Sequence, residues 1–189
     1  MKETLQAGIR YEHTFVVPQS KTVPALYPEA EEFTVMPEVF ATGFLVGLIE
    51  WACIKALQPH LDWPQEQTVG TYIEVTHEAA TPPGLEVTVT VELVAVDRKK
   101  LTFSVEAHDG IDLVSRGRHE RFVIDRAKFE RIRQAAAWIA HPLAYAAAVV
   151  VQGATHLFEE PGALEQVAKL SADWFLDHLA PSPVLSTSP

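Results

Sequence analysis

Cysteine is nearly absent from this sequence of 189 residues, in which Cys53 is the only one. A single cysteine cannot form an internal disulfide, so the composition does not indicate an oxidising compartment. The first ten residues include Lys2, Glu3 and Arg10 and lack the apolar run of a secretory signal peptide. From these absences we expect a cytoplasmic protein.

Excess positive charge is also missing, as is any long uncharged apolar segment. The chain has 15 Lys and Arg against 25 Asp and Glu, a net charge of -10, which argues against nucleic acid as the main partner because phosphate groups need a positive surface. The longest apolar stretch, residues 39–54, is interrupted by Glu50, so no membrane-spanning helix is expected. Apolar residues make up 48% of the chain, enough for the core of one domain plus a short appendage.

Motifs for metal ions and nucleotide phosphates are lacking as well. No Cys/His spacing resembles a zinc site, and no glycine-rich loop resembles a phosphate-binding loop. We therefore expect no bound metal ion and no cofactor.

The order of secondary-structure patterns predicts an α+β fold. Three prolines between residues 18 and 28 keep the first 36 residues irregular apart from one strand. The segment after Pro37 is apolar on nearly every side and favours a long buried helix, and the alternating segments that follow favour four antiparallel strands. Residues 97–100 are a predicted polar hairpin, and Asp109-Gly110 is a predicted two-residue turn. The predicted elements are a strand at 11–17, a helix at 37–58, strands at 68–80, 85–96, 101–108 and 111–124, and a helix at 126–138.

One helix covers only one face of such a sheet, so a second copy that continues the sheet edge to edge is a natural partner. The pattern changes after His141-Pro142, and we divide the chain into a domain at 1–140 and a C-terminal strand–helix extension at 141–189. The extension is predicted to contain a strand at 144–151, an amphipathic helix at 162–179 and a disordered tail at 180–189.

Glu50 is the only charged residue between positions 39 and 54, in the middle of the predicted buried helix. An unpaired buried carboxylate is costly and its pKa rises, which makes this position a candidate for catalysis. Gly43 and Gly47 lie within about 60° of it around the helix axis and leave room for a backbone or a ligand. The alternative is structural: Glu50 reaches solvent or pairs with an arginine.

Thr42 and His77 are the next candidates. Thr42 lies about 80° around the helix and about 12 Å along it from Glu50, so one extended ligand can touch both, although a buried threonine often bonds to a carbonyl of its own helix. His77 alternates with Ile73 and Val75, which points it toward the helix, where a lone histidine is usually a core residue. If the three side chains face one another, acid, hydroxyl and imidazole together suit acyl transfer.

The basic residues form two short runs. His119 lies among Arg116, Arg118 and Arg121, and a second run is formed by residues 98–100. Either run can hold phosphate groups, but such runs are more often solvated strand faces and hairpin tips. We expect His108 to be exposed and Cys53 to pack in the core.

Several strings of residues resemble the fluoroacetyl-CoA thioesterase family, over about residues 8–133. They are Lys21-Thr22-Val23, Leu26-Tyr27-Pro28-Glu29, Val39-Phe40-Ala41-Thr42-Gly43-Phe44, Val46-Gly47-Leu48-Ile49-Glu50-Trp51-Ala52-Cys53, Val75-Thr76-His77, Ala79-Ala80-Thr81-Pro82-Pro83-Gly84, Ala107-His108-Asp109-Gly110 and His119-Glu120-Arg121.

The resemblance implies a hot-dog fold, an antiparallel sheet wrapped around one long helix, in a homodimer with active sites near the subunit interface. It implies hydrolysis of a short-chain acyl-CoA, including fluoroacetyl-CoA, with Thr42, Glu50 and His77 as catalytic residues. Glu50 would attack the thioester carbonyl or activate water, His77 would act as acid and base, and Thr42 would donate a hydrogen bond. Gly70 would let the backbone approach the acyl group, and Arg121 would contact the substrate.

The resemblance also implies a lid over the acyl group, formed by Val23, Leu26, Phe33 and Met36. Met36 stands where the family has an aromatic residue, and its flexibility argues against strict selection of a fluorinated acyl group. The alternative function is a hot-dog protein that binds acyl-CoA without turnover, as a sensor or scaffold, and a hydratase on the same fold is a weaker third.

Residues 148–162 and 172–175 resemble the end of α/β-hydrolases of the dienelactone hydrolase type, in which a histidine matching His156 is the base of the triad. No Gly-x-Ser-x-Gly motif occurs in the chain, so the nucleophile elbow of that family is missing. The extension is therefore interpreted as a remnant with a packing role, and His156 as a structural residue.

Overall fold

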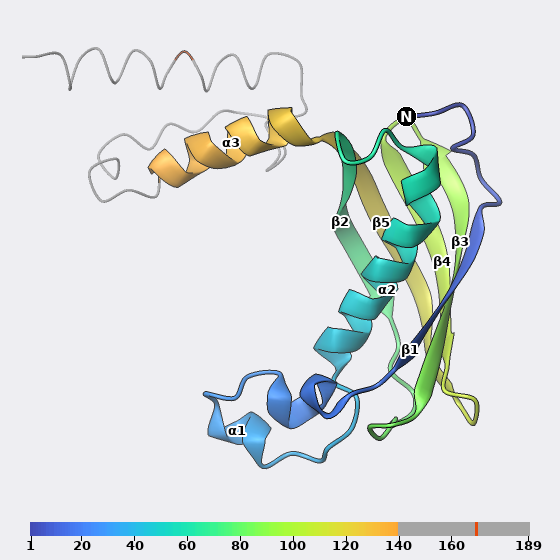
Figure 1. Ribbon diagram of the computed structural model, residues 1–189, viewed down its shortest axis with the longest axis vertical. Coiled ribbons are helices and arrows are strands. Elements are labelled where there is room, and N and C mark those ends of the chain that lie inside the picture. Colours follow the sequence, from blue (N-terminus) through green and yellow to red (C-terminus); the bar gives the residue numbers. More distant parts are fainter. Residues whose placement is uncertain (140–168, 170–189) are drawn as a thin grey trace, which may run out of the picture. The chain divides into compact units, whose positions relative to one another are not determined.

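A computed structural model describes residues 1–139 and residue 169. The chain divides into two units, Met1–Arg126 and Ala127–Pro189. The first unit holds the sheet and the long helix (Figure 1). Helix α3 (Arg126–Ile139), expected at 126–138, is confirmed. The elements predicted after residue 140 lie outside the described residues.

The first unit is built on one five-stranded antiparallel sheet with the strand order β1-β3-β4-β5-β2. Helix α2 (Thr42–Leu57) lies along one face of this sheet, which curves around it (Figure 1). This confirms the predicted α+β architecture. The strands are β1 (Arg10–Val16), β2 (Glu66–Val75), β3 (Glu86–Asp97), β4 (Lys100–His108) and β5 (Leu113–Asp125).

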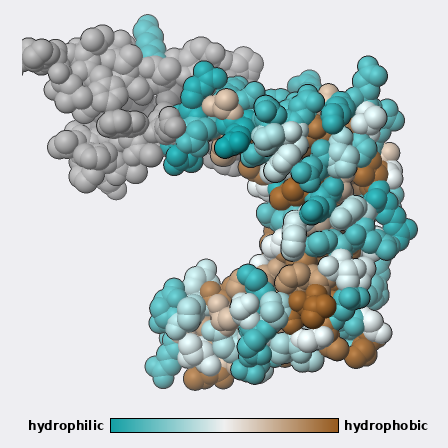
Figure 2. All heavy atoms as spheres, viewed as in Figure 1, coloured by the Kyte–Doolittle hydropathy of each residue, from teal (hydrophilic) through white to brown (hydrophobic). Residues whose placement is uncertain are grey.

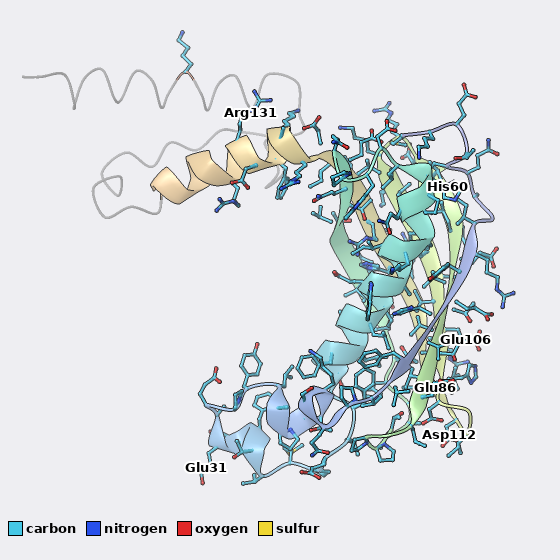
Figure 3. The ribbon with its side chains drawn as sticks, viewed as in Figure 1. Glu31, His60, Glu86, Glu106, Asp112 and Arg131 are labelled. Carbon is cyan, nitrogen blue, oxygen red and sulfur yellow. The ribbon has the colours of Figure 1, made fainter. Side chains whose placement is uncertain are left out.

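Alternation along the strands produces the core. In β4 every second residue from Leu101 to Ala107 is buried against the helix side, and the residues between them face away. Glu106, for example, lies on the face of the sheet turned away from α2 (Figure 3). Cys53 is buried in this core, as predicted. The core residues of α2 are Leu45, Leu48, Ile49, Ala52, Cys53, Ala56 and Leu57.

The expectation that α2 is buried on nearly every side is wrong for the single chain. The sheet covers one side of the helix, and Thr42, Gly43, Gly47 and Trp51 on its other side are exposed. Glu50 is half-buried at the boundary between the two sides. The polar and glycine positions of the helix therefore mark its open side.

The long helix also begins later than predicted, at Thr42 rather than at residue 37. Residues 39–41 are held extended, because Phe40 forms an isolated bridge with Thr22 and donates its N–H to the Thr81 carbonyl at 2.8 Å. The N–H of Ala41 donates to the Lys21 carbonyl at 3.1 Å. These tertiary bonds override the favourable first-turn pair at residues 37 and 38.

Two strand boundaries differ from the prediction. Strand β2 ends at Val75, and residues 76–80 continue beside β5 outside the strand, with the N–H of Thr76 donating to the Arg116 carbonyl at 2.9 Å. The predicted two-residue turn at Asp109-Gly110 is a four-residue loop, 109–112. The Asp109 carboxylate accepts from the N–H groups of Ile111 and Asp112 at 3.0 and 2.9 Å, which holds the wider loop. The hairpin at 97–100 is confirmed, with Arg98 at a φ of 55°.

Three short helices replace the expected irregular region before α2. They are 3-10 turns at Gln19–Lys21 and Val23–Ala25 and the single turn α1 (Glu31–Thr34), while a further 3-10 turn, Gln58–His60, follows α2. Figure 1 shows α1 beyond the N-terminal end of α2, and apolar residues reach the surface in this region (Figure 2). Tyr27, Val35 and Met36 are among the exposed large apolar residues.

Candidate active site

Thr42 and His77 form a pair at the N-terminal end of α2. Thr42 is the first helical residue, and His77 lies two residues beyond the end of β2. The Thr42 Oγ1 and His77 Nδ1 atoms are 2.8 Å apart, so the threonine hydroxyl bonds to the imidazole rather than serving only its own helix. The structure thus brings together two of the three candidates.

The other imidazole nitrogen of His77, Nε2, is buried and has no hydrogen-bond partner. Burial lowers the pKa of His77, and a hydrogen bond with the Ala79 backbone partly opposes this effect. A lowered pKa keeps the ring neutral at pH 7, with one nitrogen able to accept a proton. The pair is therefore suited to proton transfer.

Glu50 faces Arg121 across the interface between α2 and β5. The Glu50 Oε2 and Arg121 Nη1 atoms are 3.6 Å apart, and the two side chains are 40% and 2% exposed. The expected unpaired buried carboxylate is thus wrong: Glu50 has a cationic neighbour and is open to solvent. Its carboxylate is accessible to a ligand, while the guanidinium behind it is not.

Arg121 is held by β2 and by its neighbour on β5. Its Nε donates to Thr68 Oγ1 and its Nη2 to the Thr68 carbonyl, both at 2.9 Å. Its Nη1 lies 3.0 Å from His119 Nε2, and the His119 Nδ1 lies 2.8 Å from the Tyr72 carbonyl. Burial lowers the pKa of Arg121, and the negative charge of Glu50 opposes this.

Gly70 leaves the space that the Glu50 carboxylate occupies. A Cβ atom built at Gly70 would lie 2.7 Å from Glu50 Oε1 and 3.1 Å from His119 Cε1. Real Cβ atoms do not approach other atoms so closely, so any side chain here displaces the carboxylate. The register of β2 against β5 also shifts between Gly70 and Tyr72.

The predicted lid residues lie before α2 in the chain. Leu26 packs on the first turn of α2, since its Cδ1 lies 3.1 Å from a Cβ built at Gly43. The N–H of Val23 donates to the Val39 carbonyl at 2.9 Å, and the Phe33 ring lies 5.3 Å from that of Tyr27. Met36 is 49% exposed. The lid segment is thus anchored beside Thr42 at Val23 and Leu26.

The candidates form two groups rather than one. Within the described part of the chain, no hydrogen bond or ion pair is found between the Thr42–His77 pair and Glu50. Residues 42 and 50 are eight positions apart on α2, which separates their backbones by about 12 Å. Both groups face the open side of the helix, so an elongated molecule can contact both.

On the outer sheet face, Lys100, Arg116 and Arg118 each pair with an acidic side chain. Arg116 pairs with Glu78 at 3.0 Å, and Glu120 is shared by Lys100 and Arg118. Arg121 is buried, so it does not belong to a solvated strand face, and its contact with the substrate stays a prediction. His108 is exposed, as predicted, and its Nε2 lies 3.0 Å from Glu106 Oε1.

His119 and Thr68 were missed as members of the site. A signal was present in β5, where His119, Arg121 and Val123 alternate and share the buried face. The basic residues between positions 116 and 121 look like one continuous run in the sequence, which hides that alternation. Thr68 carried no signal of its own, because its role depends on the pairing of β2 with β5.

Metal and membrane features are absent from the described residues. No group of three or more His, Cys, Asp or Glu in residues 1–139 and 169 could hold a metal ion. In the same residues, no helix has the length and apolarity needed to cross a bilayer.

Comparisons with known proteins agree with this geometry. A family model described as fluoroacetyl-CoA-specific thioesterase matches residues 22–127. The fluoroacetyl-CoA thioesterase of Streptantibioticus cattleyicolor is 56% identical over 135 residues, which are 71% of this chain and 96% of that protein.

Solved structures share the fold. A threonine-to-serine variant of FlK in complex with acetyl-CoA is 55% identical, with a TM-score of 0.67 over 69% of this chain and 98% of that chain. TTHA0967 of Thermus thermophilus, a thioesterase superfamily member, is 29% identical, with a TM-score of 0.64 over 74% of this chain and 99% of that chain. The hot-dog fold is thereby confirmed.

The resemblance of residues 141–189 to an α/β-hydrolase is not confirmed. A segment of 35 residues, 18% of this chain, is 77% identical to 8% of a Mycobacterium tuberculosis protein named as a phosphoribosyl transferase. His156 lies outside the described residues, and its structural role stays a prediction.

Proposed function

The chain belongs to the fluoroacetyl-CoA-specific thioesterase family and is an acyl-CoA thioester hydrolase, and we propose that it hydrolyses short-chain acyl-CoA, with fluoroacetyl-CoA as the first candidate. One observation carries the proposal. A carboxylate beside a buried cation and a threonine–imidazole pair lie on the same open side of one helix. This arrangement supplies both a nucleophile or base and a proton carrier for acyl transfer.

Glu50 is proposed to act on the thioester carbonyl carbon. Its carboxylate either attacks that carbon, forming an anhydride and releasing CoA thiolate, or takes a proton from the water that attacks it. Arg121 lies at ion-pair distance from the carboxylate without covering it, because the guanidinium lies behind it in the protein interior. Single-turnover hydrolysis in ¹⁸O-water identifies the anhydride route when ¹⁸O appears in Glu50, since water places oxygen there only by attacking the Glu50 carbonyl of an anhydride.

His77 and Thr42 are proposed to handle the proton and the developing negative charge. The neutral imidazole accepts a proton from water and delivers one to the leaving thiolate. The first backbone bond of α2, from the Leu45 N–H to the Ala41 carbonyl, leaves the N–H groups of residues 42–44 unpaired within the helix. These groups, the Thr42 hydroxyl and the positive end of the helix dipole favour an oxyanion at this position.

The lid residues Val23, Leu26, Phe33 and Met36 are proposed to enclose a small acyl group. Their bulk favours a short acyl chain over a long one. Because Met36 is flexible and half-exposed, we expect acetyl-CoA and other short acyl-CoAs to compete with the fluorinated one.

We also propose that the active form is a homodimer. Among the described strands, β2 pairs with β5 alone and leaves an edge, on which Tyr72 and Ile73 are exposed apolar residues. A second copy on this edge would extend the sheet and cover the open side of α2. Full activity at a gel-filtration mass near 20.9 kDa, that of one chain, would contradict this.

The cytoplasm, where a free cysteine stays reduced, is the proposed location.

Release of free CoA thiol from a panel of short acyl-CoAs tests the function. Wild type is compared with Glu50→Gln and with Glu86→Gln, an exposed control on β3. We expect hydrolysis that falls on the order of a hundredfold or more in Glu50→Gln and is unchanged in the control, because only the first variant removes the reacting carboxylate. The ranking of substrates then identifies the acyl group.

The same measurement decides the alternative. If wild type cleaves no acyl-CoA, yet one of them raises its melting temperature, the chain is a non-catalytic acyl-CoA-binding hot-dog protein. Retention of Thr42, Glu50 and His77 favours the enzyme, since binding alone requires none of them.

A further inference from the structure

The protonation of His119 follows from its two neighbours. Its Nδ1 lies 2.8 Å from the Tyr72 carbonyl, which can only accept, so Nδ1 carries the proton. Its Nε2 lies 3.0 Å from Arg121 Nη1, which can only donate, so Nε2 offers a lone pair. Both positions are satisfied only by the neutral ring, and its side chain is buried.

Three of the five N–H groups of the Arg121 guanidinium are hydrogen-bonded to the protein. Nε and Nη2 donate to the side chain and backbone of Thr68, and Nη1 donates to His119. The remaining partner is Glu50, at 3.6 Å from Nη1. That separation allows an ion pair but exceeds the length of a hydrogen bond.

We propose that His119 is a positioning residue, which holds the Arg121 guanidinium at ion-pair distance from Glu50 and prevents it from closing on the carboxylate. The inference rests on the proposed function of Glu50 as nucleophile or base. A carboxylate clamped by a guanidinium through short hydrogen bonds is a weaker base and nucleophile than one that feels only the nearby charge. With His119 in place, the Arg121 charge acts on Glu50 through space, and the Glu50 oxygens are not covered by hydrogen bonds from the guanidinium.

Loss of the His119 imidazole would leave one N–H of Arg121 Nη1 without its acceptor. A buried N–H without an acceptor is costly, so Nη1 takes the nearest remaining acceptor, which is Glu50. The two bonds to Thr68 act as a pivot for this movement, because they hold the opposite edge of the guanidinium. The ion pair then becomes a hydrogen-bonded clamp.

The charged and titratable groups around this cluster come from two elements. Arg121 and His119 face it from β5, and Glu50 and Cys53 face it from α2. From β2 the cluster is met by Thr68 and Gly70, which do not titrate. Neither His119, which is held neutral, nor Cys53, whose thiol has a raised pKa, adds a charge near neutrality.

The experiment compares His119→Leu, which removes the acceptor, with His119→Gln, whose carbonyl can still accept from Nη1. His108→Leu, the same change at an exposed site on β4, is the control. Two experiments are made on the full-length protein. Steady-state kinetics give kcat and KM for the best acyl-CoA, and ¹³C NMR follows the titration of the Glu50 carboxyl. The Glu50 signal is assigned by its loss in Glu50→Gln.

For His119→Leu we expect kcat to fall on the order of tenfold or more with KM within about threefold, because ground-state binding is left intact. The Glu50 carboxyl titrates at lower pH than in wild type, because the clamp stabilises its charged form. His119→Gln recovers most of the wild-type kcat and most of the wild-type Glu50 titration, and His108→Leu matches wild type in both.

Other results overturn the inference. A Glu50 titration that is unchanged or moves to higher pH in His119→Leu shows that Arg121 does not close on the carboxylate. Should His119→Leu fail to fold, a His119→Gln protein whose kcat falls as much as that of Arg121→Leu has the same meaning. Absence of any wild-type hydrolysis refutes the proposed function instead, while the NMR titration still decides whether His119 positions Arg121.

Discussion

Replacement of Gly70 by alanine is the most direct test of how the site is packed. The new Cβ would lie 2.7 Å from Glu50 Oε1, so the carboxylate must retreat by about 0.7 Å or more to reach an ordinary contact. The second neighbour, His119 Cε1 at 3.1 Å, has to yield by a few tenths of an ångström. The glutamate is flexible and half-exposed, so it moves instead of the backbone.

This displacement separates activity from stability. A misplacement of about 1 Å at a reacting group costs on the order of a hundredfold in rate, which corresponds to about 2.7 kcal/mol in the activation barrier. Stability should not suffer, because alanine restricts the unfolded chain and raises the free energy of unfolding by about 0.4–1 kcal/mol where the native backbone accepts it. We therefore expect Gly70→Ala to lose activity while its melting temperature is unchanged or higher.

Thiol release from the preferred acyl-CoA, together with thermal unfolding, measures both effects. Ser104→Thr, which adds one methyl group at an exposed site on β4, is the control and should behave as wild type. A Gly70→Ala protein with wild-type kcat/KM would refute the reasoning, since it would show that catalysis tolerates a displaced Glu50 carboxylate.

Two further predictions concern the core and one loop. Hydrogen bonds from the backbone of Asp112, then of Ile111, and from Thr81 lower the pKa of Asp109 below the ordinary value of 3.8 for this side chain. A carboxyl group with a lowered folded-state pKa contributes stability above its unfolded pKa and loses it as the pH falls through the folded value. Asp109→Asn should therefore melt at a lower temperature than wild type at pH 5–7, with a gap that narrows below about pH 3.8; a gap independent of pH would contradict this. Burial raises the pKa of the Cys53 thiol to about 12, so a disulfide reagent at pH 8 should react with no thiol in the native protein and with one in guanidinium chloride. Rapid reaction of the native protein would place Cys53 outside the core.

Much of the fold could be predicted from local patterns. Alternation of residue types predicted strands β3 and β4, and burial alternates along most of both strands in the structure. The apolar segment around Glu50 predicted the central helix. The start of that helix could not be predicted, because residues 39–41 are fixed by Thr22, Lys21 and Thr81, which come from distant parts of the chain. The four-residue loop at 109–112 depends in the same way on the Asp109 carboxylate.

From local patterns, without the family resemblance, the site was predictable only as far as single residues are unusual in their surroundings. Glu50 is conspicuous as the one charge between positions 39 and 54, and His77 as the one imidazole in an apolar alternation. Gly70 has no such signal, because its importance comes from an oxygen on α2 that lies where its side chain would be. Arg121 was placed in the wrong environment, because a run of basic residues does not reveal which of them the pairing of β5 with β2 buries.

The positions of the charges on α2 and β5 give a physical reason why the cation is buried while the carboxylate is exposed. A cation exposed beside Glu50 would be solvated and would contribute little, whereas a guanidinium that is 2% exposed interacts through a medium of lower permittivity. Burying that cation is costly unless its donors are satisfied, and Thr68 and His119 supply the acceptors without adding charge. The carboxylate can then remain at the surface of the helix, charged and uncovered, where a thioester can reach it. An exposed reactive carboxylate therefore depends on a buried arginine that Thr68 and His119 hold by hydrogen bonds, and His119 is the component that keeps the two apart.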